Sequence, residues 1–316
     1  MNKKLILACD LGGTNLRMAA VNAEGEILHF VKVATPKAKH PAEIVRLVVE
    51  AAEQCRAAVE HHGAVLALAA AVPATINAAE GIILKSPNIP ALDEFGFSSV
   101  VSAALNLPVV LENDANAAAT GEHAFGAAKG FLNAVTVTLG TGVGGGVIIN
   151  GVLLRGVDGT AGEIGHICVE PQGAPCGCGS VGCVEQYASA TAIVRLTLES
   201  ADQYPNSMLL SKTPLTSLDI YQAGIKGDAL ALETFRRMGF YLGAALADLV
   251  NVLNPEIIVI GGGASAAWDL FVPHTRQQIN RHAFREPAER VRLVRSLLDD
   301  AAGILGASKS GFDRIA

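Results

Sequence analysis

The sequence lacks the features of a membrane-spanning or nucleic-acid-binding protein. Its net charge is −6 and its sequence pI is about 5.8, so it has no basic excess with which to bind a phosphate backbone. The longest apolar runs, such as 64–72, are far too short to cross a bilayer. The N-terminal apolar run is too short for a signal peptide and is followed directly by Asp10 and a glycine pair. We therefore expect a cytoplasmic protein that contacts neither a membrane nor a nucleic acid.

Cysteine is also scarce, with six residues in a chain of 316. Three of the six fit a single metal site, whereas Cys9, Cys55 and Cys168 are scattered in apolar surroundings. This distribution indicates a reducing compartment rather than a disulfide framework. We expect the three scattered cysteines to pack in the core.

The stretch 163–185 reads EIGHICVEPQGAPCGCGSVGCVE and contains a His-x9-Cys-x-Cys-x4-Cys pattern. Three thiols and one imidazole are the ligand set of a closed, four-coordinate structural zinc site. Glycines between the ligands allow the tight backbone that directs closely spaced sulfurs at one ion. The alternative is four unrelated buried residues, but chance rarely places such residues in so short a glycine-rich run. The predicted ligands are His166, Cys176, Cys178 and Cys183.

A glycine-rich segment, Asp10 to Asn15, lies between short apolar runs that read as strands at 5–9 and 16–21. A turn at 22–25 and a third strand at 27–33 follow. Because the glycines connect two strands and do not open a helix, they are neither a Rossmann nor a P-loop motif. Backbone N–H groups of such a turn can still bind phosphate oxygens, and Asp10 could hold Mg²⁺ through water. The alternative is an ordinary hairpin turn.

Asp114 follows a short strand at 109–111 and precedes an alanine-rich helix. A carboxylate at such a junction is commonly exposed to a cleft, although Asn113 or Asp114 could instead be only a helix N-cap. Upstream, the pattern predicts a helix at 41–61, a buried strand at 64–72 and an irregular segment at 73–90.

The first motif recurs at 134–155 as a strand, a glycine-rich turn at 140–146 and further short strands. An apolar strand at 256–260, ending in three glycines, echoes the strand at 64–72. This internal duplication predicts two α/β lobes, each presenting a glycine–threonine turn to the cleft between them. We expect a small lobe formed by 1–115 and 297–316, and a large lobe, 116–296, that carries the zinc loop.

Several segments of the sequence resemble the motifs of the ROK family of sugar kinases and repressors. The matching segments are DLGGTN, ENDANAAA, LGTGVGGG, AGEIGH, CGCGSVGCVE and IGGG, spread between residues 10 and 263. Within the family the sequence is most similar to the bacterial ATP-dependent glucokinases. The resemblance implies an α/β, two-lobed actin-like (ribonuclease-H-like) fold. It also implies phosphorylation of a hexose 6-hydroxyl, ATP with Mg²⁺, a structural Zn²⁺ and a homodimer or homotetramer.

The resemblance also implies a role for each matching residue. Asp114 aligns with the catalytic base. Sugar ligands are assigned to Asn88, Asn113, Asp114, Glu163, His166 and Glu185. The first phosphate turn is assigned to Asp10, Gly12, Gly13 and Thr14, and the second to Gly140, Thr141 and Gly142. The adenosine side is assigned to Gly261, Gly262 and Gly263. The zinc ligands match the four residues named above.

Four alternatives to this interpretation come from the sequence. The hexose could be fructose, N-acetylglucosamine, N-acetylmannosamine, allose or mannose, particularly because Ala74 stands where the family usually has glycine near the sugar. The phosphoryl donor could be polyphosphate or ADP. A sugar-responsive repressor is less favoured, because Asp10 lies almost at the N-terminus and leaves no room for a helix-turn-helix domain before it. A zinc-stabilised binding protein would leave both phosphate turns unexplained.

Overall fold

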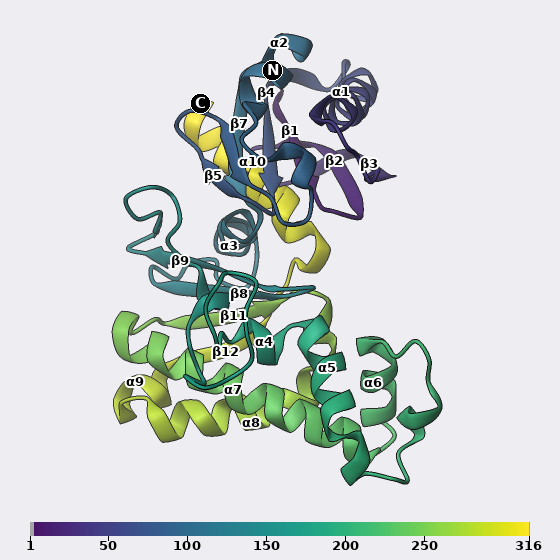
Figure 1. Cartoon of the computed structure of the whole chain (residues 1–316). Helices are drawn as coiled ribbons and strands as arrows, with labels where there is room; N and C mark the ends of the chain where they lie inside the picture. Colours follow the sequence, from purple (N-terminus) through teal and green to yellow (C-terminus); the bar gives the residue numbers. More distant parts are fainter. Residues whose placement is uncertain (1–2, 316) are drawn as a thin grey trace. The chain divides into compact units, whose positions relative to one another are not determined.

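The computed structural model describes residues 3–315 and contains two five-stranded sheets with the same pattern of connections (Figure 1). The first sheet has the order β3-β2-β1-β4-β7 and the second the order β10-β9-β8-β11-β12. The strands of the first sheet are β1 (Lys3–Leu11), β2 (Asn15–Asn22), β3 (Ile27–Ala34), β4 (Gly63–Val72) and β7 (Val109–Asn113). Those of the second are β8 (Ala134–Leu139), β9 (Val143–Ile149), β10 (Val152–Leu153), β11 (Ile257–Gly261) and β12 (Arg292–Arg295).

The strand directions of the two sheets correspond as well. In the first sheet β1 is antiparallel to β2 and parallel to β4, which is parallel to β7. In the second, β8 is parallel to β11, which is parallel to β12, and β9 is antiparallel to β10. The internal duplication and the α/β class predicted from the sequence are therefore confirmed.

Two compact units can be distinguished along the chain. Unit 1 consists of Met1–Gly130, Gly146–Gly162 and Leu297–Ala316, and unit 2 of Phe131–Gly145 and Glu163–Ser296. The sequence suggested a lobe boundary after residue 115, whereas compact unit 1 continues through α3 (Asp114–Phe125) to Gly130. The assignment of folding domains stays a prediction.

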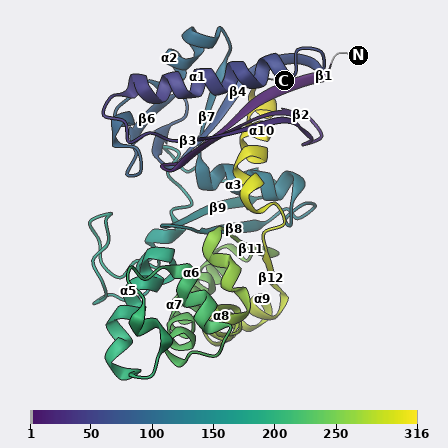
Figure 2. The same cartoon turned by 90° about the vertical axis from the view of Figure 1, so that its right-hand side faces the viewer.

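The first sheet is covered by helices on both faces, as Figure 2 shows. Alternate residues of β1 point to opposite faces, so Leu5 and Leu7 join a core with α1 (Pro41–Ala58) and α2 (Phe97–Leu105). Ile6 and Ala8 join a second core with α3 and α10 (Ala302–Ile315). As expected from the sequence, the C-terminal helix packs on the first sheet.

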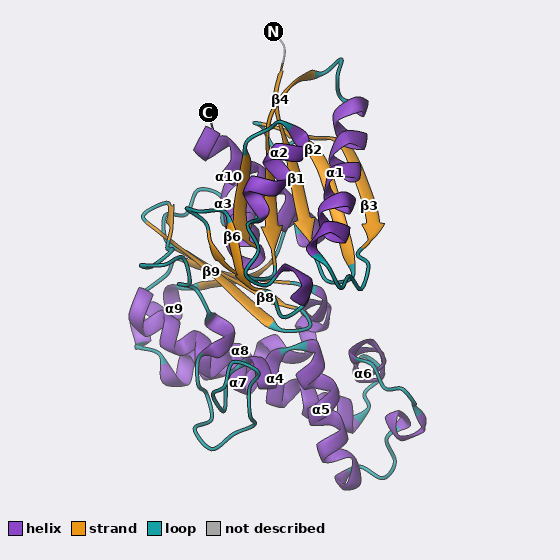
Figure 3. Cartoon of the chain, turned by 45° about the horizontal axis from the view of Figure 1, so that its top comes forward, coloured by secondary structure: helices purple, strands orange, loops and turns teal. Residues whose placement is uncertain are grey.

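The α-helices of unit 2 come after the metal-ligand stretch in the sequence, and they are purple in Figure 3. The longest, α7 (Ala229–Leu253), begins at the N-cap Asp228, whose side chain accepts the Ala231 N–H, and packs along α8 (Trp268–His282). The other helices of this unit are α4 (Glu185–Ala188), α5 (Ala190–Ser200), α6 (Ser217–Gly224) and α9 (Arg285–Arg290). No helix in residues 3–315 is both long and apolar enough to cross a membrane.

The structure corrects three local predictions. The segment 73–90 is not wholly irregular, because β5 (Thr75–Asn77) and β6 (Ile82–Lys85) form a hairpin whose Ile76 and Ile83 are buried. The glycine run 140–146 is a turn only as far as Gly142. The next three glycines lie in β9, where Ile164 leaves no space for a side chain at Gly145 and Ala119 leaves none at Gly146. Finally, Cys9 and Cys55 are buried as predicted, whereas Cys168 is exposed.

Candidate functional site

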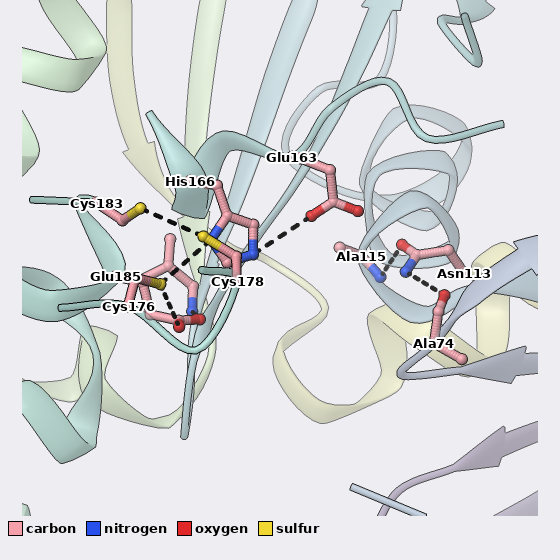
Figure 4. A network of polar contacts seen from close by, with 10 residues as sticks. Ala74, Asn113, Ala115, Glu163, His166, Cys176, Cys178, Cys183 and Glu185 are labelled. Atoms are coloured by element: carbon pink, nitrogen blue, oxygen red, sulfur yellow. Dashed lines mark hydrogen bonds and ion pairs between the residues drawn. The ribbon is translucent and has the colours of Figure 1, made fainter. Parts of the chain in front are cut away.

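The four predicted metal ligands converge in unit 2 (Figure 4). One ligand atom from each of His166, Cys176, Cys178 and Cys183 lies within 4.8 Å of every other. The Cys176 Sγ lies 3.6 Å from His166 Nδ1, and the Cys178 Sγ lies 3.7 Å from the Cys183 Sγ. His166 comes from a short 3₁₀ turn, Ile164–His166, and the thiols come from the loop that follows.

These distances fit a tetrahedral zinc site. With Zn–S bonds of about 2.3 Å, neighbouring sulfurs of a tetrahedron are about 3.8 Å apart. Disulfide sulfurs would be about 2.05 Å apart, so the Cys178–Cys183 separation is not that of a disulfide. Burial and the adjacent Cys176 and Cys178 thiols raise the pKa of Cys183 to about 12. Crowded thiols ionise together only when a cation neutralises them, so the donor set suits a metal ion.

The backbone of the loop brings the sulfurs together through short-range hydrogen bonds. The Cys176 N–H donates to Ser180 O, and the Gly179 N–H donates to Cys176 O. Between Cys178 and Cys183, Gly182 has φ +69° and a Cβ there would collide with Glu170 O, so only glycine fits. The glycines that the sequence placed among the ligands therefore have a steric cause at this position.

Two carboxylates lie beside this cluster. Nε2 of His166, the nitrogen directed away from the thiols, lies 3.9 Å from Glu163 Oε2. Glu185 Oε1 lies 3.9 Å from the Cys176 Sγ. The His166 side chain is 35 % exposed and that of Glu163 is 55 % exposed, so both can reach a ligand from solvent. The structure thus brings together three predicted sugar ligands, Glu163, His166 and Glu185, with the metal ligands.

The first glycine turn connects β1 and β2 in unit 1. The Gly12 N–H donates to Asn15 O at 3.0 Å, and Thr14 and Gly13 are exposed. A Cβ at Gly13 would lie 3.0 Å from Asn88 O, so the predicted sugar ligand Asn88 packs directly against this turn. The turn therefore presents N–H groups and one hydroxyl to solvent beside Asn88.

Asp10, at the end of β1, is mostly buried and ion-paired. Arg17 Nη1 donates to Asp10 Oδ2 at 2.9 Å, and Arg17 Nη2 reaches Asp300 at 2.9 Å. Burial raises the pKa of Asp10, and Arg17 partly opposes this effect. Arg17 thus balances the charge of the carboxylate that the sequence assigns to Mg²⁺.

The second glycine turn connects β8 and β9 and is closed by a hydrogen bond from the Gly140 N–H to Gly142 O at 2.9 Å. The Val143 N–H that follows it donates to Glu185 Oε2 at 3.1 Å. Gly262 has φ +81°, and a Cβ there would lie 2.6 Å from Leu139 O, at the start of this turn. The predicted adenosine-side loop after β11 and the second phosphate turn are therefore neighbours within unit 2.

A hollow of about 570 Å³ lies beside the second turn. It is lined mainly by one face of α5, and its wall includes the ion pair between Arg195 and Glu199. Its lining residues are Thr141, Ala190, Thr191, Val194, Arg195, Leu198 and Glu199. Of these, the sequence analysis identified only Thr141. The sequence alone did not indicate which face of α5 borders the turn.

Asp114 is the first residue of α3 in unit 1. Asn113 is the N-cap, and its Oδ1 accepts the N–H groups of Ala115 and Asn116, both at 3.0 Å. The Asn113 Nδ2 donates to Ala74 O at 3.3 Å (Figure 4). The capping alternative therefore holds for Asn113, and the cap leaves Asp114 in the first turn of α3, at the positive end of the helix dipole.

The sequence analysis missed a buried ion pair next to this carboxylate. The Glu112 side chain is 2 % exposed and accepts Arg155 Nη1 at Oε1 (2.8 Å) and Arg155 Nη2 at Oε2 (2.6 Å). Arg155 lies just beyond β10, and its carbonyl accepts the Ala161 N–H. The pair holds the loop 155–162 against the end of β7. Glu112 was visible in the motif, but its partner 43 residues away was not.

Comparisons with known proteins identify the family of this chain. The profile described as the ROK family matches residues 6–310. A glucokinase of Halalkalibacterium halodurans is 37 % identical over 314 residues, which cover 97 % of this chain and 94 % of that protein. A glucokinase of Thermotoga maritima is 34 % identical over 319 residues, covering 100 % and 99 %.

Among solved structures, a ROK family glucokinase from Streptomyces griseus in complex with glucose and AMPPNP has a TM-score of 0.82 and 36 % identity. The match covers 96 % of this chain and 98 % of that one. The actin-like kinase fold implied by the sequence motifs is therefore confirmed. From the family profile, these full-length similarities and the duplicated sheets, we conclude that the chain belongs to the ROK family.

Proposed function

We propose that the protein is a hexose kinase that transfers the γ-phosphoryl group of ATP to the 6-hydroxyl of glucose. The observation that carries this proposal is the recurrence of one exposed glycine–threonine turn at the same place in two sheets of identical strand order. Paired turns of this kind suit a polyphosphate chain, because each offers backbone N–H groups to phosphate oxygens. Glucose is favoured because the relatives named above are glucokinases.

Asp114 is assigned as the general base of this reaction. Phosphoryl transfer depends mainly on alignment and on neutralisation of charge, so the protein needs few chemically active groups. Asp114 accepts the proton of the sugar 6-hydroxyl as that oxygen attacks the γ-phosphorus, and ADP leaves. Its place in the first turn of α3 supports the assignment, because the positive end of a helix dipole is a favourable position for a carboxylate.

The sugar hydroxyls near the anomeric carbon are assigned to Glu163, His166 and Glu185. A bound Zn²⁺ would be a structural ion held by four protein ligands, with no open position at which to activate water. With Nδ1 committed to the metal, the proton of His166 resides on Nε2, which then donates to a sugar hydroxyl. The proximity of Nε2 to Glu163 supports a shared sugar contact.

The nucleotide is assigned to the two glycine turns, the glycines after β11 and the hollow beside α5. Gly12, Gly13 and Thr14, and Gly140, Thr141 and Gly142, bind phosphate oxygens. The lining of the hollow, which is mostly apolar, suits a nucleoside. Asp10 holds Mg²⁺ of the nucleotide through water, with Arg17 fixing the carboxylate.

A coupled assay over a panel of sugars and phosphoryl donors tests the proposal. We expect glucose with Mg·ATP to give the highest kcat/KM, above fructose, mannose, allose, N-acetylglucosamine and N-acetylmannosamine. ATP should exceed ADP and polyphosphate as donor. Absence of turnover with every pair, in protein shown to hold its metal, would remove the kinase assignment. A different preferred sugar would keep the reaction and change the substrate.

A further inference from the structure

The second glycine turn is held from two sides by the segments that carry the metal ligands. We propose that occupation of the metal site orders this turn, and so controls nucleotide affinity independently of the sugar. The inference rests on the proposed function only in taking the turn as a nucleotide contact. The contacts that carry it all lie within unit 2.

One side of the turn is held by the chain that leaves the metal site. Only two residues after the ligand Cys183, Glu185 Oε2 accepts the Val143 N–H at 3.1 Å. Farther along, the Ala190 N–H donates to Gly140 O at 2.8 Å, and Thr191 Oγ1 donates to Thr141 O at 3.0 Å. Every residue from Gly140 to Val143 except Gly142 thus donates to or accepts from the segment 185–191.

Gly142 is also in contact with this segment. A Cβ at this position would collide with Glu185 Oε2, so the carboxylate lies against the turn itself. The other oxygen of the same carboxylate, Oε1, lies 3.9 Å from the Cys176 Sγ. One side chain therefore touches a metal ligand with one oxygen and holds the turn with the other.

The other side of the turn is packed against the turn that carries His166. A Cβ at Gly165 would collide with Val143 O, and a Cβ at Gly145 would lie 2.5 Å from Ile164 Cδ1. Residues on both sides of Val143 thus depend on where His166 and Cys183 are fixed. The backbone N–H of Val184 also donates to Ile167 O at 2.9 Å, which joins the two ligand-bearing segments.

A metal ion that binds His166 and Cys183 fixes both segments at once. Without the ion, the segments that carry His166 and Cys183 lose the bond they share, and the contacts on Val143 lose their common support. Loss of one hydrogen bond to a charged acceptor weakens binding by about tenfold or more when that bond orders the binding site. We therefore expect Mg·AMPPNP to bind at least about tenfold more weakly to metal-free protein in the absence of sugar.

Cys178→Ser tests this without a chelator that would also remove Mg²⁺. Cys178 is an exposed ligand, and Cys168→Ser is the matched control, because Cys168 is an exposed cysteine of the same loop outside the ligand cluster. The measurements are metal content, the Kd of Mg·AMPPNP by calorimetry without sugar, and hydrogen exchange of the Val143 amide. We expect only Cys178→Ser to lose metal, bind nucleotide weakly and exchange faster at Val143.

Glu185→Gln tests the hydrogen bond from the Val143 N–H to Glu185 separately from metal binding. It should keep the metal, because all four ligands remain, yet exchange faster at Val143 than the wild type. If Cys178→Ser does not fold, wild-type protein prepared without zinc and titrated with Zn²⁺ gives the same comparison. Unchanged exchange at Val143 and a nucleotide Kd within twofold after metal loss would overturn the inference. If no form binds Mg·AMPPNP, the proposed function fails, and exchange at Val143 still decides whether the metal orders the turn.

Discussion

The two glycine turns of the duplicated sheets are each closed by a backbone hydrogen bond, but different segments of the chain support them. Each has one backbone hydrogen bond across it, from Gly12 to Asn15 in the first and from Gly140 to Gly142 in the second. The first is braced from within its own sheet by Thr35, just beyond β3, whose Oγ1 donates to Gly12 O at 2.7 Å. The second is braced by the segment that follows the metal loop.

The strand lengths explain the difference. In the first sheet β3 has eight residues and runs far enough to place Thr35 on the turn. Its counterpart β10 has only two residues, and the chain then turns into the loop 155–162. The duplication therefore preserved the sheet and the turn, whereas the neighbouring support of the turn changed. In unit 2 the segment that follows the metal loop holds the glycine turn, as the residue just beyond β3 does in unit 1.

The largest effect is expected from a residue outside both turns. If the two glycine turns only bind phosphates, removing the Asp114 carboxylate should leave both turns intact and stop phosphoryl transfer. We expect Asp114→Ala to lower kcat by about 10²- to 10⁴-fold, with glucose and Mg·AMPPNP still bound. Steady-state kinetics measures kcat, and calorimetry measures the binding of glucose and Mg·AMPPNP. Asp313→Ala, which replaces a surface aspartate paired with Lys309, is the control; retained turnover in Asp114→Ala would exclude it as the base.

The next effect concerns the metal loop and the sugar. We expect Cys178→Ala to lose metal and to raise the Kd of glucose by about 10- to 100-fold, because His166 is no longer fixed by its ligand bond. The hydrogen bonds that hold Gly12, with Asn15 and Thr35, lie within unit 1, so hydrogen exchange at Gly12 should not change. Metal analysis and glucose titration are the measurements. An unchanged glucose Kd in metal-free protein would show that metal binding to this loop does not affect glucose binding.

A matched pair of substitutions compares the two braces directly. Thr35 is 8 % exposed, so Thr35→Val leaves Gly12 O without its partner and should lower the free energy of unfolding by about 1–3 kcal/mol. Thr191 is exposed, so Thr191→Val, the same chemical change at the second turn, should cost less than about 0.5 kcal/mol. Urea denaturation checks both. Equal losses would mean that the two braces do not differ as the structure indicates.

The smallest effect is electrostatic and belongs to the first turn alone. Asp10 corresponds to Thr138 in the second sheet, so only the first turn has a carboxylate at its base. Because burial raises the pKa of Asp10, the folded state binds its proton more tightly than the unfolded state does. This contribution to stability is fully present below the unfolded pKa, about 3.8, and is lost as pH rises through the folded pKa.

Asp10→Asn removes that pH dependence. The unfolding free energy of the wild type relative to Asp10→Asn should therefore fall as pH rises from about 4. Denaturation curves across this range for both proteins give the difference. A difference that instead increases with pH would mean that the Arg17 ion pair outweighs burial and lowers the pKa of Asp10.

The sequence predicted the features that depend on local pattern. Apolar runs flanked by glycines gave the strands on both sides of each turn, and the spacing of His166 and the three thiols gave the metal cluster. It did not predict that Gly145 and Gly146 lie in a strand, where the close approach of Ile164 and Ala119 requires glycine. The Glu112–Arg155 pair and the hollow beside α5 likewise depend on contacts between distant segments.

The central claim is that the protein phosphorylates oxygen 6 of glucose with ATP, and the product identifies that reaction directly. Metal-loaded protein is incubated with glucose and Mg·ATP, and the product is examined by ³¹P and ¹³C NMR. We expect stoichiometric ADP and a phosphate ester whose coupling to phosphorus is at carbon 6. A phosphate ester at another carbon, or release of free phosphate from ATP without a sugar ester, would contradict the account.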